Sequence, residues 1–200
     1  MNLLALDISL NTAGVARLVA VQAGQPVWDT ETVKVPPRRV VTGLYKNGKA
    51  REKNVPRVGA ARLAFWHDWL VEELSRGPEL VAIEATAMGA VGHKLDQAEL
   101  VGVLRLACFQ RGVPFIEISV QHIKQFATGL HDCDKKRMTD TAVAFFGEGV
   151  CGEHEADAAW LGELARCAFL GGQETDAQGK VVANVVKAAK NAFGEGVRER

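Results

Sequence analysis

The sequence has no long apolar run. A transmembrane helix needs about 20 consecutive apolar residues, and no segment of the 200 residues approaches that length. Basic residues do not precede the apolar start of the chain, so the features of a secretory signal peptide are also missing. We therefore expect a cytoplasmic protein with no membrane partner.

Cysteine is scarce, and its residues are not arranged in pairs. The 4 cysteines include no CxxC pair, which is the spacing on which most structural zinc sites depend. Cys151 and His154 lie close together but lack a second pair of ligands. The cysteines therefore favour free thiols in a reducing compartment over a zinc site or a disulfide framework.

Net charge is absent too, because 24 Lys and Arg residues balance 24 Asp and Glu residues. Total charge thus indicates no nucleic-acid partner, whereas the distribution of charge does. Residues 34–62 are strongly basic and contain Glu52 as their one acid, while residues 148–176 are mostly acidic. This asymmetry is expected of a domain with one side facing a polyanion and another facing metal ions.

What the sequence contains first is an apolar strand with one carboxylate set into it. Residues 2–9 carry Asp7 within a run of Leu, Ala and Ile, and strands that are apolar on both faces are typical of the centre of α/β sheets. Burying an isolated carboxylate is costly unless a cation or hydrogen bonds compensate it. Asp7 is therefore either a structural residue bonded to nearby backbone or a metal ligand.

The order of the expected elements indicates an α/β fold. Short turns join strands over 2–9, 15–20 and 27–35, which predicts an antiparallel meander. Two later strands are expected over 80–84 and 115–118. Helices are expected over 57–76, 94–111, about 120–127, 135–146 and about 153–170, with weak helical character over 180–193. Together they predict a five-stranded mixed sheet, three antiparallel strands and then two parallel ones, flanked by helices.

A basic insertion at about 36–56 interrupts this order. It contains Gly, Asn and Tyr45, is too polar for the core, and is long for a simple connection. We expect an irregular loop there, either solvated or in contact with nucleic acid. The DNA contacts expected from this insertion are Arg38, Arg39, Lys49 and Lys53.

Two further carboxylates occupy positions as unusual as that of Asp7. Glu84 ends a second buried strand, and open α/β sheets place their sites at the carboxyl ends of strands. His154 and Asp157 share one face of a helix at i, i+3 spacing. Three acids from three elements suit Mg²⁺, which prefers oxygen ligands and leaves room for a phosphate. Two such ions, about 3.5–4 Å apart, would serve phosphodiester hydrolysis.

Several segments of the chain resemble the RuvC-type Holliday-junction resolvases of the RNase H-like superfamily, over residues 1–170. The segments are Leu6–Leu10 with Thr12 and Gly14, Ala82–Glu84, Lys94–Ala98 with Gly102, Ile123–Gln125 with Gly129 and Lys135, and His154–Ala159. The acids alone would be shared with many relatives. The Lys-Leu-x-Gln-Ala helix and the paired lysines narrow the resemblance to this branch.

The resemblance implies a set of site residues and a cofactor. The implied catalytic and metal-binding residues are Asp7, Glu84, His154 and Asp157. Lys124 and Lys135 match basic residues of the family's DNA-binding cleft, where Lys135 would also stabilise charge on the phosphate as a catalytic residue. The cofactor implied is Mg²⁺, with two ions per site and Mn²⁺ as a substitute.

The activity implied is that of a crossover junction endodeoxyribonuclease. Such an enzyme resolves four-way and other branched DNA by paired nicks that leave 5′-phosphate and 3′-hydroxyl ends. Two opposed nicks require two sites, so a homodimer with two-fold symmetry is implied. The helix over 94–111 would be an interface element, or else a plain core helix. Residues 1–170 would form the nuclease domain and 171–200 a C-terminal extension.

The chain departs from the family in two places. The family commonly has an aromatic residue three positions after the second acid, where this chain has Ala87. Stacking on an aromatic ring is worth about 1–3 kcal/mol per base, so its absence weakens the expectation of sequence-selective cutting. The basic insertion is the second departure. Together they favour a bacteriophage-type member that grips the junction by charge.

Other functions stay open at this point. Exonucleases of the superfamily have a second acid at the position of Ser9, which counts against that class. Actin-like kinases need a glycine-rich phosphate-binding turn, and Ser9–Asn11 is a poor one. An RNase H-like enzyme that processes ribosomal RNA would keep the same acids and is the nearest enzymatic alternative. A non-catalytic junction-binding protein would keep the basic insertion but would not need three buried acids.

Overall fold

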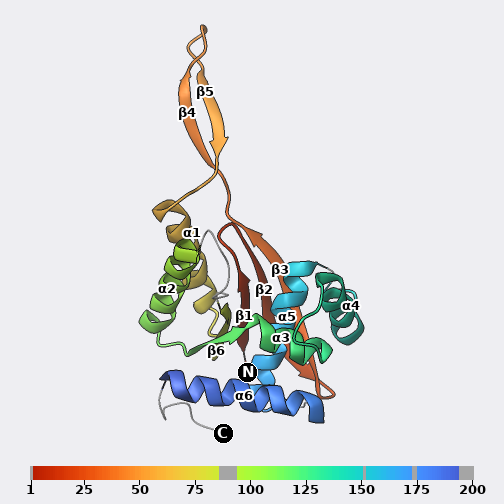
Figure 1. Ribbon diagram of the computed structural model, residues 1–200. Coiled ribbons are helices and arrows are strands. Elements are labelled where there is room, and N and C mark those ends of the chain that lie inside the picture. The colour runs from red at the N-terminus through yellow and green to blue at the C-terminus, as the bar shows by residue number, and fades with distance from the viewer. Residues whose placement is uncertain (1, 86–93, 151, 173–174, 194–200) are drawn as a thin grey trace.

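The structure is a computed structural model that describes residues 2–85, 94–150, 152–172 and 175–193 (Figure 1). Its centre is a five-stranded sheet with the order β3-β2-β1-β6-β7. The strands are β1 (Leu3–Ile8), β2 (Thr12–Gln22), β3 (Gln25–Lys34), β6 (Leu80–Ala85) and β7 (Phe115–Ser119). β1 to β3 pair antiparallel, while β1, β6 and β7 pair parallel. The predicted mixed sheet is confirmed.

Helices cover both faces of this sheet. They are α1 (Ala60–Leu74), α2 (Lys94–Gln110), α3 (Val120–Thr128), α4 (Lys135–Phe146), α5 (Glu153–Phe169) and α6 (Asp176–Phe193). Leu4 and Leu6 of β1 pack with α1 and α2 on one face, whereas Leu3 and Ala5 pack with α3 to α6 on the other. Among the described helices, none is long and apolar enough to cross a membrane.

Helix α5 lies directly against the sheet because small residues form its inner face. Its residues from Ala158 to Cys167 are all buried. A Cβ added at Gly162 would come within 2.6 Å of the ring of Trp28 and 3.2 Å of Ala5. This close approach brings the first turn of α5 next to the ends of β1 and β2, and the acids of that turn next to Asp7.

The basic insertion is a β-hairpin, so the prediction of an irregular loop is wrong. β4 (Arg38–Leu44) and β5 (Ala50–Val55) form a separate two-stranded sheet that projects from the body in Figure 1. Nearly all of its side chains are exposed. Because neither face is buried, the alternation of apolar and polar residues that marks an ordinary strand is missing from its sequence. We refer to residues 38–55 as the arm.

The segment after α5 is more structured than its weak helical pattern predicts. Helix α6 begins at Asp176 rather than near 180, and Val181, Val182 and Val185 are buried in the same core cluster as α5 and β7. In Figure 1, α6 lies across the end of the body opposite the arm. This helix therefore contributes to the core, while the division of the chain at residue 170 stays a prediction.

Candidate active site

Asp7 and Glu84 lie side by side at the carboxyl edge of the sheet. The parallel register pairs Leu6 with Ile83, so the next residues along, Asp7 and Glu84, are level on neighbouring strands. Side chains alternate between the faces of a strand, and Ala5 and Ala82, two residues before each acid, pack with α5. Both carboxylates therefore point to the face that α5 covers.

The first turns of α5 bring a third acid and a histidine to this edge. The Nδ1 atom of His154 lies 3.2 Å from Oδ2 of Asp7. Asp157 follows one turn later and is close enough to Asp7 for the two charges to interact. A carboxylate of β1, one of β6 and one of α5 thus lie within electrostatic range of one another.

Gly14 makes this approach of α5 to the sheet feasible. It lies on β2 directly opposite Asp7, and a Cβ at this position would overlap the main-chain carbonyl of His154. The obstacle is backbone, which cannot turn aside as a side chain can. The close approach of α5 therefore explains why a glycine occupies position 14, within the first segment that resembles the RuvC-type resolvases.

Replacing Gly14 by Ala should move the start of α5 and lower stability. Overpacking of this kind costs about 1–3 kcal/mol, which corresponds to a fall in melting temperature of roughly 2–12 °C for a chain of this size. Thermal unfolding followed by circular dichroism checks the result. Gly149→Ala is the matched control, since a Cβ there meets nothing within 4 Å; an equal loss in both variants would contradict the role of Gly14.

The pKa values of all three carboxyl groups are raised. Burial is the main cause of the rise for Glu84, followed by the charges of Asp7 and Asp157, and together they raise its pKa to about 8. Burial and Asp7 raise the pKa of Asp157 to about 6. Burial also raises the pKa of Asp7, although the hydrogen bond with His154 opposes it. The chain alone therefore does not fully compensate the negative charge gathered here.

Two lysines stand close to these acids. Asp134 caps α4 by accepting a hydrogen bond from the Arg137 amide at 2.8 Å, which fixes Lys135 in the first turn. Its Nζ donates to Glu153 at 2.8 Å. This bond, together with the charges of Asp157 and Asp7, raises the pKa of Lys135.

Lys124 is the second lysine near the acids. It lies on α3, which Ser119 caps by accepting a hydrogen bond from the His122 amide at 3.3 Å. Its Nζ donates to the carbonyl of Cys133 at 2.9 Å and lies 3.6 Å from Asp132. Its charge lowers the pKa of Glu84, though less than burial and the other acids raise it. Each acid of the site therefore has a cation within electrostatic range.

The donors present fit a hard divalent cation. They are mainly carboxylate oxygens, the ligands that Mg²⁺ prefers, and their negative charge is buried and only partly compensated by the nearby lysines and His154. Within the described ranges, no three Asp, Glu, His or Cys side chains are grouped closely enough to be a preassembled metal site. Which of the four side chains would coordinate metal therefore stays a prediction.

The predicted site residues fall into two groups in space. Asp7, Glu84, His154 and Asp157 meet at one edge, with Lys124 and Lys135 nearby. Arg38, Arg39, Lys49 and Lys53 lie instead on the arm, and Ala87 lies outside the described residues. Glu153, the partner of Lys135, is not among the predicted residues, although its place in an acidic run at the start of a helix is a signal for it.

A mixed five-stranded sheet of this order, with helices on both faces, is an RNase H-like fold. Thermus thermophilus RuvC shares this fold. Its complex with a Holliday junction substrate superposes with a TM-score of 0.60 at 20% identity, covering 81% of this chain and 90% of that one. A second structure of the protein gives 0.57 at 21% identity over the same shares. The predicted fold class is confirmed.

The sequence itself is similar to a RuvC protein over part of its length. It is 35% identical over 63 residues to the crossover junction endodeoxyribonuclease RuvC of Gloeobacter violaceus. The match covers 32% of this chain and 36% of the relative, so it spans about a third of that protein's length. No family model matches the chain. The resemblance to RuvC-type resolvases predicted from the sequence motifs is confirmed, in fold and in this shared segment.

Proposed function

We propose that this chain is a metal-dependent, structure-selective endonuclease that resolves Holliday junctions and other branched DNA by paired nicks. The observation that carries the proposal is the meeting of Asp7, Glu84 and Asp157 on a RuvC fold. Buried acids with raised pKa values cost stability unless a cation compensates them, and such clusters are typical of functional sites. The products would carry 5′-phosphate and 3′-hydroxyl ends.

The residues of the site have distinct roles in this proposal. Asp7, Glu84, Asp157 and His154 would hold Mg²⁺, or Mn²⁺ in its place, as two ions per site. Bound there, the cations supply Lewis-acid chemistry and neutralise charge on the phosphate. The hydrogen bond between His154 and Asp7 fixes the orientation of that carboxylate.

The two lysines would receive the DNA backbone. Lys135 is two-thirds exposed and held by Glu153, so its ammonium can turn to a phosphate oxygen without leaving a buried charge behind. Lys124 is held by the carbonyl of Cys133, and its charge acts on Glu84. A pair of point charges near the carboxylates would hold the phosphodiester backbone at the site.

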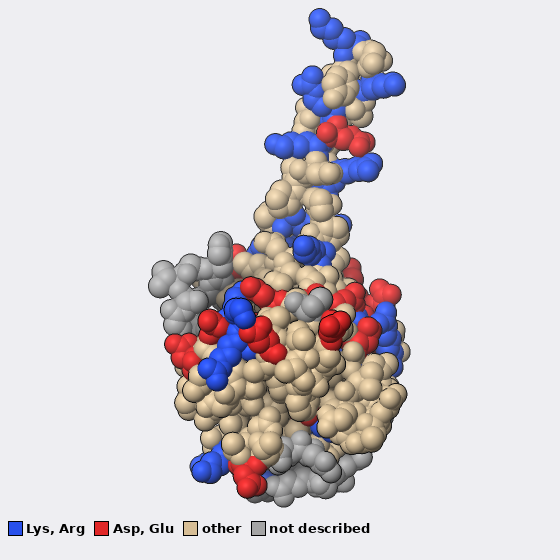
Figure 2. All heavy atoms as spheres, turned by 90° about the vertical axis from the view of Figure 1, so that its right-hand side faces the viewer, with Lys and Arg blue, Asp and Glu red and all other residues tan. Residues whose placement is uncertain are grey.

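Arg38, Arg39, Lys49 and Lys53 would add DNA contacts outside this cleft. All four lie on the arm, where Figure 2 shows basic side chains along its length and acidic ones gathered on the body below. Neutralising phosphates in this way gives affinity with little dependence on sequence. Such contacts suit a chain in which the aromatic residue expected at position 87 is an alanine.

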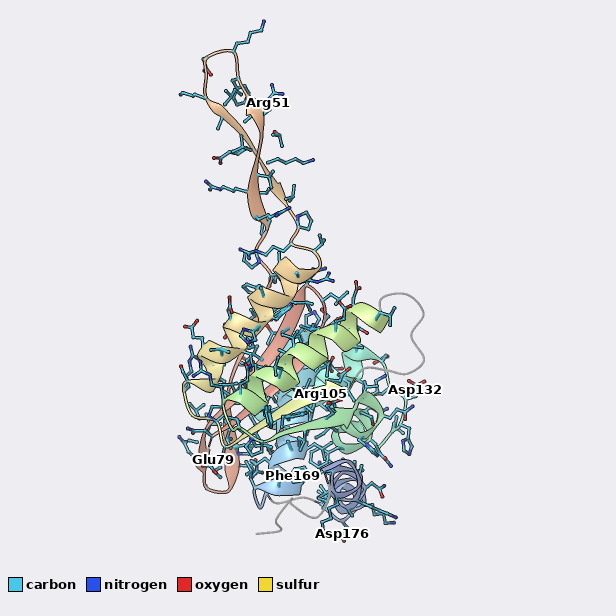
Figure 3. The ribbon with its side chains drawn as sticks, turned by 90° about the vertical axis from the view of Figure 1, so that its left-hand side faces the viewer. Arg51, Glu79, Arg105, Asp132, Phe169 and Asp176 are labelled. Carbon is cyan, nitrogen blue, oxygen red and sulfur yellow. The ribbon has the colours of Figure 1, made fainter. Side chains whose placement is uncertain are left out.

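Paired nicks require a homodimer, and α2 offers the surface for it. Leu95, Leu106 and Phe109 are 79%, 51% and 79% exposed and recur at helical spacing with Gly102, forming an apolar stripe. The face toward the viewer in Figure 3 includes α2. Apolar residues exposed in a row along a helix are typical of a protein interface.

Replacing Phe109 by Glu should give a monomer at micromolar concentration, since a charge would be buried without a partner in the dimer. Size-exclusion chromatography with light scattering measures the mass. Val19→Glu is the control, because Val19 is 62% exposed but lies on β2. A mass unchanged by Phe109→Glu, or halved equally by Val19→Glu, would remove α2 from the interface.

Cleavage of synthetic substrates tests the proposed function. A four-way junction, a linear duplex, a flap and an RNA stem-loop, each labelled at one 5′ end, are incubated with the chain in Mg²⁺ or in excess chelator. We expect symmetric nicks in the junction that require the metal. Preferred cleavage of the RNA would favour the RNA-processing alternative. Junction binding without any cleavage in Mg²⁺ or Mn²⁺ would favour the non-catalytic one.

A further inference from the structure

The two faces of the arm differ in charge. Residues that pair across the hairpin share a face, and β4 and β5 pair Arg38 with Val55, Val40 with Lys53 and Gly43 with Arg51. The cations Arg38, Arg51 and Lys53 therefore lie on one face, which carries no acid. We call this the basic face.

The opposite face is nearly neutral. It pairs Arg39 with Asn54 and Val41 with Glu52. Arg39 lies 3.6 Å from Glu52, which offsets its charge. Val41 and Leu44 complete this face and are 60% and 69% exposed. The positive charge of the two strands is thus concentrated on one side, a difference that the list of basic residues in the sequence does not reveal.

The arm is rooted at the edge of the sheet that carries the acids. β3 leads into it, and Lys34 at the end of β3 pairs with Thr12, just after the turn that follows β1. The Val35 amide donates to the carbonyl of Asn11 at 2.9 Å. Arg57, which follows the arm, donates to the carbonyl of Pro36 at 3.2 Å and so connects the segment that enters the arm with the segment that leaves it. DNA held at Asp7 would therefore leave the site past the base of the arm.

The dimensions of the arm suit a duplex. The 7 residues of β4 extend over about 23 Å at roughly 3.3 Å per residue, and the turn adds to this length. One turn of DNA is about 34 Å long, and its major groove, about 12 Å wide, admits a two-stranded β-ribbon. In Figure 3, Arg51 lies near the far end of the arm, well away from the body.

A two-stranded ribbon of this kind has little stability by itself. An isolated two-stranded hairpin is marginally stable in water, and β4 and β5 pair with each other alone in the described sheets. Tyr45 and Arg51 stabilise its outer end, since the guanidinium lies 4.8 Å from the centre of the ring. The charge of the basic face matches a polyanion rather than an apolar or acidic protein surface.

We infer that the arm seats in the major groove of the duplex that leaves the active site, with Arg38, Arg51 and Lys53 toward the DNA. This inference rests on the proposed function, because it takes branched DNA as the substrate. It specifies which face of the arm meets the DNA, and the basic composition alone does not specify this. Arg39, although 79% exposed, would face away and contribute little, so the register removes it from the four arm residues proposed above as DNA contacts.

Single neutral substitutions separate the two faces. Binding of a fluorescent four-way junction to the full chain is measured by anisotropy in excess chelator, at several salt concentrations. Arg51→Gln and Lys53→Gln should each weaken binding about five- to ten-fold and reduce the slope of log K against log salt by about one. Arg39→Gln removes the same charge and should change affinity less than about two-fold. Lys53→Gln leaves the Tyr45–Arg51 contact intact, so its effect is independent of that contact.

Dimethyl sulfate footprinting tests the groove. Guanine N7 faces the major groove, so the wild-type chain should protect guanines within about one turn of the crossover, and Arg51→Gln should lose this protection while Arg39→Gln keeps it. Unprotected guanines, or equal effects of Arg39→Gln and Arg51→Gln, would overturn the inference. Cleavage of the junction in Mg²⁺ is scored separately. A chain that cuts junctions but fails these tests would leave the proposed function standing, and a chain that passes them without cutting would refute the function alone.

Discussion

Replacing Asp7 by Asn should abolish junction cleavage while leaving junction binding nearly unchanged. We expect the single-turnover rate in Mg²⁺ to fall by about a thousand-fold or more, and the dissociation constant in chelator to stay within about three-fold. Asp7 is central to the site because it interacts with His154, Glu84 and Asp157. The amide of Asn has nearly the same shape as the carboxylate of Asp but lacks the negative charge that binding of a divalent cation would need.

This substitution should not harm the fold. The carboxylate of Asp7 raises the pKa values of Glu84 and Asp157, so removing its charge relieves that repulsion, and the amide can keep the hydrogen bond with His154. Asp68→Asn is the matched control, because Asp68 is an 80% exposed carboxylate on α1. Cleavage retained by Asp7→Asn within about ten-fold, or a loss of binding as large as the loss of cleavage, would mean that Asp7 has another role.

The acids could be found from sequence because each is a costly exception in an apolar context. Asp7 and Glu84 end runs that only a central strand explains, and Asp157 lies on the inner stripe of a helix that must pack. Burial of such residues without compensation is disfavoured, so their presence indicated a site before any geometry was known. Strand ends and helix starts then sufficed to place them together.

The partners of these acids depended on distances that the sequence does not encode. Glu153 pairs with Lys135 across 18 positions, and the reason for Gly14 is a close approach of backbone from α5. Neither follows from periodicity. Gly14 belonged to a recognised segment, but its contact required the register between β1 and β2.

The arm was missed for a physical reason of a different kind. Strands are recognised by alternation between a buried and an exposed face, and the arm buries neither. Arg38–Leu44 also contains Gly43, at which the pairing with β5 shifts by one residue, and this irregularity further weakens the pattern. Positive charge was evident in the sequence, whereas its separation onto one face required the hairpin register.

Replacing Glu84 by Gln should make the metal-free chain more stable at alkaline pH. The pKa of Glu84 is raised from 4.5 to about 8 in the folded chain. A carboxyl group with a raised pKa binds its proton more tightly in the folded than in the unfolded state, so its contribution to stability is greatest below about 4.5 and is lost as the pH rises through about 8. Above that range the fold carries a buried charge that Gln lacks.

The size of this effect can be bounded. The shift corresponds to a few kcal/mol, and partial exposure of the site to solvent reduces it to about 2–4 kcal/mol. In chelator, Glu84→Gln and the wild type should therefore melt at similar temperatures near pH 4.5, where the wild-type group is largely protonated. Near pH 8.5 the variant should melt roughly 4–16 °C higher. Thermal melts across this range, followed by circular dichroism, measure the difference.

The same thermal melts, repeated with Mg²⁺, distinguish a site that binds a metal ion from a cluster of acids that only repel one another. Mg²⁺ added near pH 8.5 should stabilise the wild type, by about 2.7 kcal/mol at a concentration a hundred times its dissociation constant, and should stabilise Glu84→Gln much less. Glu72→Gln, an exposed change on α1, should respond to pH and to Mg²⁺ as the wild type does. If Glu84→Gln melted no higher than the wild type at alkaline pH, Glu84 would not carry a buried charge close to the other acids. If Mg²⁺ stabilised both chains equally, Glu84 would not contribute to the binding of the cation.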